Sequence, residues 1–101
     1  MYVSRLTFHT LPGHTDEVER QLKSLQQMVA GVGGQHPRVL RSHFASLGAP
    51  DIVFEQDAED LATLEHQIEQ VAHSDEFHRW SEGVSPLLAE SPKREIYDVR
   101  S

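Results

Sequence analysis

Two histidines and two arginines are the residues of this sequence best suited to acid–base chemistry on an anionic ligand. His9 and His43 can move a proton near neutral pH, because the imidazole group titrates in that range. Arg5 and Arg41 can hold a carboxylate or an enolate, since a guanidinium stays charged and donates several hydrogen bonds. These side chains can act together only if the fold brings them to one surface.

The segments that carry these residues alternate as β-strands do. In residues 2–9, Leu6 and Phe8 share one face, and in residues 38–47, Leu40 and Phe44 share one face. We expect the strand faces that carry these four apolar residues to pack against the helices. Parity then predicts one polar group on the opposite face of the sheet, and it consists of Arg5, Thr7, His9, Arg41 and His43, joined by Glu55 if Val53 points the same way.

Two helical regions separate the strands. After the turn Leu11-Pro12-Gly13, Thr15 is expected to cap a helix whose apolar stripe recurs at spacings of three and four, through Val18, Leu22, Leu25, Val29 and Val32. Asp57 is expected to cap a second helix with the stripe Leu61, Leu64, Ile68 and Val71. This pattern breaks at residues 73–75, where Ser74 can cap a further segment with Phe77, Trp80, Val84 and Leu87.

The order of elements predicts an α+β, ferredoxin-like fold over a single domain, residues 1–101. Ile52–Glu55 and Lys93–Val99 complete a βαββαβ pattern, and the helices cover one face of a four-stranded antiparallel sheet. The other face keeps apolar side chains, among them Val3, Val39 and Val53. We therefore expect two subunits to pair face to face as a dimeric α+β barrel, whose lumen could hold a small ligand.

The polar group on this face has two interpretations. The arginines and histidines could bind an anionic or enolate-like ligand in the lumen, with His9, His43 and Arg41 catalytic and Arg5, Thr7 and Glu55 in contact with the ligand. Alternatively, Arg5, Arg41 and Glu55 form cross-strand ion pairs at the dimer interface, and the histidines lie solvated at strand ends.

The second half of the chain carries a family resemblance. Glu59-Asp60-Leu61, His73-Ser74-Asp75-Glu76-Phe77 and Pro86-Leu87-Leu88 precede a final strand, and together they resemble the dimeric α+β barrel superfamily. The likeness is nearest to antibiotic biosynthesis monooxygenase-like and NIPSNAP-like domains. Proteins similar to these include cofactor-free quinone-forming oxygenases, haem-degrading oxygenases, small cyclases and isomerases, and many proteins without known activity.

The resemblance implies three alternative functions. The first is a small-molecule-binding homodimer that acts, without a cofactor, as a monooxygenase or isomerase on an aromatic or enolisable compound. The second is a non-enzymatic dimer that binds a ligand or a partner. The third is haem binding, in which a histidine would ligate iron. Haem-degrading relatives place a histidine and a tryptophan on the helical segment where this chain has His73, His78 and Trp80. They also place an asparagine on the first strand, where this chain has Ser4, Arg5 and Thr7 instead. Trp80 also fits the apolar stripe, so it is either a core residue or a ligand contact.

Composition excludes several other classes of function. The net charge of −7 disfavours binding to nucleic acid or to anionic membranes, and there is no cysteine to form a disulfide, a thiolate nucleophile or a zinc-thiolate site. The N-terminus has no continuous apolar run, so neither a signal peptide nor a membrane span is expected, and the cytoplasm is the natural compartment. The seven histidines show no i, i+4 pair and no H-E-x-x-H motif, so no metal site is predicted.

Overall fold

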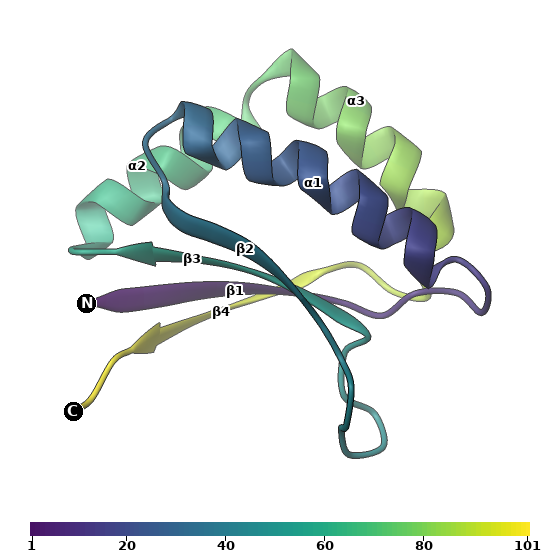
Figure 1. The fold of residues 1–101 in the computed structure, drawn as a ribbon. Helices are drawn as coiled ribbons and strands as arrows, with labels where there is room; N and C mark the ends of the chain where they lie inside the picture. The colour runs from purple at the N-terminus through teal and green to yellow at the C-terminus, as the bar shows by residue number, and fades with distance from the viewer.

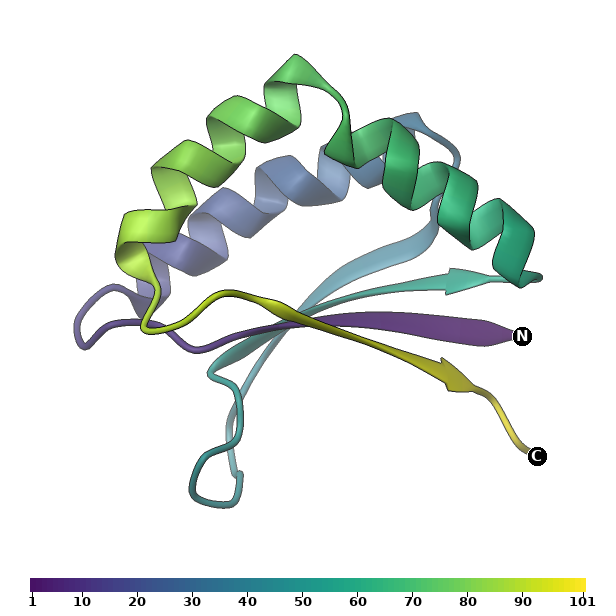
Figure 2. The same ribbon diagram turned by 180° about the vertical axis from the view of Figure 1, so that it is seen from behind.

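The computed structural model describes residues 1–101, and it confirms the ferredoxin-like fold. The strands are β1 (Tyr2–Phe8), β2 (Gln35–Arg41), β3 (Ile52–Ala58) and β4 (Lys93–Asp98), and the helices are α1 (Thr15–Gly31), α2 (Leu61–Ala72) and α3 (Asp75–Val84), followed by the short 3₁₀ helix η1 (Ser85–Leu87). The strands form one antiparallel sheet in the order β2-β3-β1-β4. All the helices cover one face of this sheet, and the other face is open (Figures 1 and 2).

Helix α1 forms because its apolar residues return to one side. Val18, Leu22, Leu25 and Val29 are buried against the sheet, and Asp16 and Glu17 place negative charge at the positive end of the helix. Thr15 was expected to cap this helix, but it is the first helical residue and His14 occupies the cap position. The Thr15 hydroxyl instead hydrogen-bonds the Thr10 hydroxyl at 2.6 Å.

The second helical region is broken where the sequence predicted. Ser74 caps α3 by accepting a hydrogen bond from the Phe77 amide at 3.1 Å. Asp60 caps α2 by accepting from the Thr63 amide at 2.8 Å. The expectation that Asp57 caps this helix is wrong, because β3 continues to Ala58 and Asp57 pairs with Arg38 on the open face.

The connection from α1 to β2 requires a glycine at position 34. A Cβ added to Gly34 would lie 2.3 Å from Cγ1 of Val29 and 2.8 Å from the Val29 carbonyl oxygen, which no side chain tolerates. His36 then takes a left-handed φ of 48°, at an irregularity in the pairing of β2 with β3 between Gln35 and Arg38. This irregularity sets which way the rest of β2 faces.

The main core lies between α1, the end of α2 and the helix side of the sheet. Its buried members are Phe8, Val18, Leu22, Leu25, Val29, Ile52, Phe54 and Val71. Trp80 packs on this core with its ring edge-on to Phe8 and stacked on Phe77, and its indole N–H donates to the Gln21 carbonyl at 2.7 Å. None of the helices is long and apolar enough to span a bilayer.

Candidate functional site

The parity expected for β1 and β3 is confirmed. Ser4, Leu6 and Phe8 face the helices, whereas Arg5 and Thr7 lie on the open face. Glu55 also lies there, opposite Arg5 in the register of the sheet. Three of the expected polar residues are thus on one surface.

The parity expected for residues 38–47 is wrong. Val39 pairs with Phe54 and packs against the core, so Leu40 faces the open side and Arg41 faces the helices. Arg41 binds Asp16 and Glu19 on α1, with its Nη1 2.5 Å from Oδ1 of Asp16 and 3.3 Å from Oε1 of Glu19. The strand ends at Arg41, and His43 lies in the exposed loop that follows. Neither residue joins Arg5 on the open face.

His9 lies just beyond the end of β1. Its Nδ1 is 2.7 Å from the Glu90 carboxylate, and its Nε2 is 3.0 Å from the Gly48 carbonyl oxygen. The imidazole therefore bridges the β2–β3 loop and the segment before β4. Both ring nitrogens are occupied by protein partners.

Charged residues of three strands form a compact cluster on the open face. The carboxylate of Glu55, with only 6% of its side chain exposed, lies 2.7 Å from Nη2 of Arg5 and 2.9 Å from Nη2 of Arg38. Arg38 also binds Asp57 at 3.0 Å, and this bond, with those to Glu55, raises the pKa of Arg38 above its ordinary value. Each arginine already has a carboxylate partner, so the cluster is a cross-strand network, as the second interpretation expected for Arg5 and Glu55, but Arg38 takes the place expected for Arg41.

A different arginine lies on the helix side of the sheet. Arg94 of β4 is opposite Leu6 in the register, and its guanidinium donates to the Ser4 hydroxyl. Arg94 is an exposed residue of the edge strand β4, but partial burial of its guanidinium lowers the pKa of Arg94 from its ordinary value. No carboxylate binds it, whereas Arg5, Arg20, Arg38, Arg41 and Arg100 all have one. Its positive charge is therefore partly desolvated and has no opposite charge beside it.

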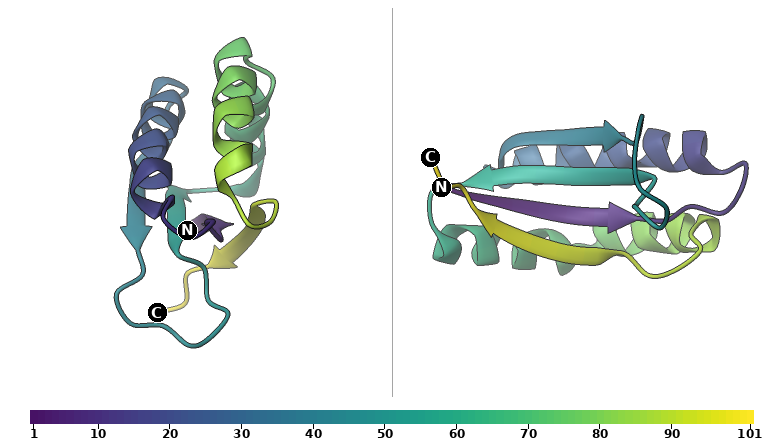
Figure 3. Two further views of the ribbon diagram at one scale, coloured as in Figure 1. Left: turned by 90° about the vertical axis from the view of Figure 1, so that its right-hand side faces the viewer. Right: turned by 90° about the horizontal axis from the view of Figure 1, so that it is seen from below.

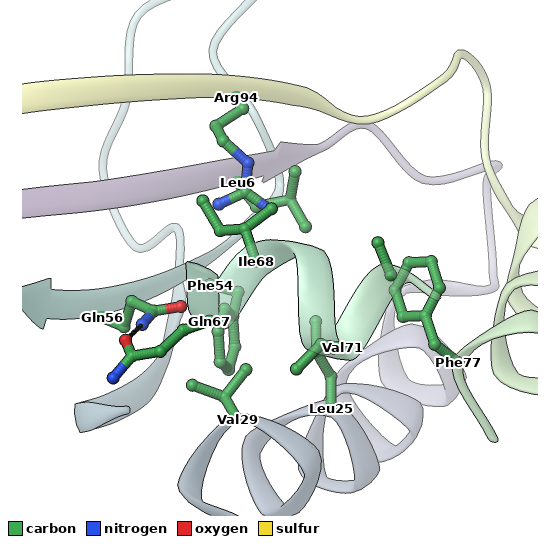
Figure 4. Close-up of a pocket in the computed structure, with 11 residues that line it drawn as sticks. Leu6, Leu25, Val29, Phe54, Gln56, Gln67, Ile68, Val71, Phe77 and Arg94 are labelled. Atoms are coloured by element: carbon green, nitrogen blue, oxygen red, sulfur yellow. Dashed lines mark hydrogen bonds between the residues drawn. The ribbon is translucent and has the colours of Figure 1, made fainter. Parts of the chain in front are cut away.

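Arg94 lies where two cavities meet. The outer cavity, about 200 Å³, lies beside α3 and is lined by Trp80, Val84, Leu88 and Pro92, among others. The inner cavity, about 40 Å³, lies between the helices and the sheet. Leu6, Phe77 and Arg94 line both of them, and Figure 4 shows Arg94 reaching from β4 across Leu6 toward Ile68.

The inner cavity has one polar end. It is lined mainly by Leu25, Val29, Phe54, Ile68 and Val71, but Gln56 and Gln67 lie opposite the Phe77 end (Figure 4). The Gln56 amide donates to the Gln67 carbonyl oxygen at 3.1 Å. We call the two cavities together with Arg94 the α3 groove.

Of the ligand contacts predicted from the sequence, only Trp80 lines the α3 groove. The sequence pattern predicted no such role for Arg94, Gln56 or Gln67, which also line it. Gln67 carried a signal, because it lies three residues after Leu64 and four before Val71 and so occupies the apolar stripe. Arg94 could be placed only once the register of β4 was known. His73 and His78 are exposed and no histidine lines either cavity, so the groove offers no imidazole ligand for a haem iron.

The chain resembles known proteins in three-dimensional structure. No protein-family model and no curated protein matches the chain. A candidate antibiotic biosynthesis monooxygenase from Nitrosomonas europaea is similar in structure, with a TM-score of 0.72, 15% identity and 98% of each chain covered. A NIPSNAP domain protein from Burkholderia xenovorans has a TM-score of 0.74 at 14% identity, over 100% of this chain and 96% of the other. PA3566 from Pseudomonas aeruginosa has a TM-score of 0.72 at 21% identity, over 99% and 94%. The chain thus has the α+β fold of antibiotic biosynthesis monooxygenase-like and NIPSNAP domain proteins.

Proposed function

We propose that this protein binds a small, largely apolar molecule in the α3 groove and holds one anionic oxygen of that molecule on Arg94. The observation that supports this is a guanidinium with no carboxylate partner at the meeting point of two mainly apolar cavities. A charge in that position is costly to bury, and an anionic ligand would offset the cost with a charge-assisted hydrogen bond. The aromatic rings of Phe77 and Trp80 favour a planar ligand beside it.

Such a site also supports the expected reaction class, a cofactor-free oxygenation or isomerisation of an aromatic or enolisable compound. Arg94 would stabilise a phenolate or enolate and so lower the pKa of the bound hydroxyl group. In an oxygenation, the resulting electron-rich ring carbon takes one atom of O₂ and becomes a carbonyl carbon. The other oxygen atom leaves as water with the ring hydrogen and the hydroxyl proton. In this proposal Arg94 has the role of stabilising the oxyanion that the sequence suggested for Arg5 and Arg41.

A homodimer is part of the same proposal. The open face carries Leu40 and Tyr97, each more than 40% exposed. The β2–β3 loop projects on that side (Figure 3), and its Phe44 and Leu47 are almost fully exposed. A second copy of the sheet would cover these apolar side chains and enclose the Glu55 cluster.

Ligand binding is tested with 2-naphthoate, using the fluorescence of Trp80, the sole tryptophan, as the readout. We expect Arg94→Met to weaken binding about tenfold or more, because a charged hydrogen bond is lost. Arg79→Met is the matched control, since Arg79 also lacks a carboxylate partner but is exposed on α3 and lines neither cavity. Uncharged 2-methylnaphthalene should bind the wild type and Arg94→Met equally.

Equal affinity of the wild type and Arg94→Met for 2-naphthoate would refute the role of Arg94. A wild type that binds neither naphthalene compound at millimolar concentration would refute the groove as a ligand site. The reaction class is tested separately by oxygen consumption with a panel of naphthols and dihydroxynaphthalenes. There, the wild-type rate should exceed that of Arg94→Met.

A further inference from the structure

Two glutamines form the polar end of the inner cavity. Gln56 of β3 is 4% exposed and Gln67 of α2 is 8% exposed. Each amide has the other as its side-chain hydrogen-bond partner, at 3.1 Å, and Figure 4 shows the pair at one end of the cavity. The side chains around them are those of Val29, Phe54 and Val71, so this is a polar contact inside an apolar core.

Stability alone gives little reason for a buried polar pair at this position. A buried hydrogen bond adds little net stability, and replacing both partners with apolar groups of similar shape is often neutral or stabilising. The bond uses only half of the two amides, because Oε1 of Gln56 and Nε2 of Gln67 have no protein partner. Nε2 of Gln67 points away from the cavity, toward the turn at Gly33, whereas Oε1 of Gln56 points to the cavity side (Figure 4). One acceptor thus remains available beside the cavity.

The size of the inner cavity limits which chemical groups can reach the Gln56 oxygen. A single water fills about 10–15 Å³ of a cavity measured in the same way. The inner cavity, at about 40 Å³, therefore admits a small substituent but not a ring. The outer cavity, at about 200 Å³, has room for a ring system beside Phe77 and Trp80. Since Leu6, Phe77 and Arg94 line both spaces, a ring bound outside can direct a substituent inward.

We propose that Gln56 determines ligand specificity by accepting a hydrogen bond from a hydroxyl substituent of the molecule held at Arg94, with Gln67 fixing the orientation of the Gln56 amide. This inference rests on the proposed function and narrows it. The ligand class is a planar aromatic or enolic anion that carries a hydroxyl group away from its anionic oxygen. Because the pair presents an acceptor to the cavity, it selects a hydroxyl group over a carbonyl group.

The test compares 2-naphthoate with its ring-hydroxylated isomers. In the wild type, we expect at least one isomer to bind about three- to tenfold more tightly than 2-naphthoate, the gain from one hydrogen bond. In Gln56→Met/Gln67→Met, that preference should disappear, while the affinity for 2-naphthoate and the Tm stay the same or rise. Gln70→Met is the matched control, because Gln70 is an exposed glutamine of α2 and lines neither cavity of the groove.

The outcomes separate this inference from the function beneath it. If 2-naphthoate binds in an Arg94-dependent way but no isomer binds better, or if the preference survives in the double variant, the glutamines do not select the ligand and only this inference is refuted. If 2-naphthoate does not bind at all, the proposed function is refuted as well. Gln56→Leu provides a second variant should the double substitution not fold, and it too should abolish the preference, because it removes the oxygen that faces the cavity.

Discussion

Nε of Arg5 donates to Oε2 of Glu55 across 2.8 Å, from one strand of the sheet to its neighbour. Arg38 approaches the other carboxylate oxygen from the opposite strand, with its Nε 3.1 Å from Oε1. One nearly buried carboxylate therefore bridges two guanidinium groups, and Asp57, bound to Arg38, supplies the second negative charge of the cluster.

Removing Glu55 should destabilise the fold. In Glu55→Leu, Arg5 loses its carboxylate partner and Arg38 keeps only Asp57, so the two neighbouring arginines repel each other. We expect the free energy of unfolding to fall by about 1–3 kcal/mol, less than for a fully buried pair because both arginines are partly exposed. Added salt should recover part of the loss by screening the repulsion. Urea unfolding measures both effects. Glu59→Leu, at an exposed acidic residue without an ion pair, is the control, and a loss as large there would contradict the cluster as the cause.

Most of the fold could be predicted because local patterns agreed with it. The stripe from Val18 to Val29 and the cap at Ser74 each have one simple structural solution. Residues 38–47 did not, because β2 is an edge strand and carries adjacent apolar residues, Val39 and Leu40. The alternation that pairs Leu40 with Phe44 predicted the wrong face for Leu40. The irregularity near His36 fixes the register, but the pattern of apolar residues does not reveal it.

The candidate site was harder to predict because its residues meet only through tertiary contacts. Arg94 differs from the other arginines in lining both cavities without a carboxylate partner, and both features depend on where the side chains of distant elements lie. Arg41 has the same residue type, yet it faces Asp16 and Glu19 on α1. The sequence could identify the arginines but could not tell which of them are paired or which line a cavity.

Gly34 should not tolerate a side chain. We expect Gly34→Ala to lower the free energy of unfolding by about 1–3 kcal/mol, because its Cβ would meet Val29 at 2.3 Å and force the end of α1 away from the sheet. Gly83→Ala is the matched control, since nothing lies within 4 Å of its Cβ and the residue is helical, so alanine there should stabilise by about 0.5–1 kcal/mol. Thermal unfolding of the two variants should shift in opposite directions; a shift in the same direction would contradict the close approach at position 34.

Trp80 should matter for both stability and binding. Trp80→Phe loses the 2.7 Å hydrogen bond to the Gln21 carbonyl and part of the contact with Phe8, so we expect a loss of about 1–2 kcal/mol in the free energy of unfolding. It also removes part of the wall of the outer cavity, so 2-naphthoate should bind more weakly. Calorimetry measures both. An unchanged affinity would place the ligand away from α3.

Asp60 should make the stability of α2 depend on pH. The Thr63 amide and hydroxyl lower the pKa of Asp60 below its ordinary value of 3.8. A lowered folded-state pKa means that the carboxylate stabilises the fold above its ordinary pKa and that this contribution is lost as the pH falls through the folded-state value. Asp60→Ala should therefore have a lower Tm than the wild type at about pH 7, and the difference should shrink toward about pH 2. Asp60→Asn, which keeps a capping oxygen, should lose less at neutral pH, and a pH-independent difference would contradict the role of the charge.

The two faces of the molecule offer a matched test of the dimer. Leu40 is 43% exposed on the open face of the sheet, and Leu61 is 41% exposed at the start of α2 on the helix side. A glutamate at either position enters a partly exposed site and leaves the core intact, so both variants should fold. If a second copy covers the open face, the wild type and Leu61→Glu sediment at twice the chain mass of 11.4 kDa, and only Leu40→Glu sediments as a monomer, because its charge would be buried against the partner. A wild type that sediments at the mass of one chain at micromolar concentration would leave the open face in water, but it would not affect the α3 groove, because one chain lines both of its cavities.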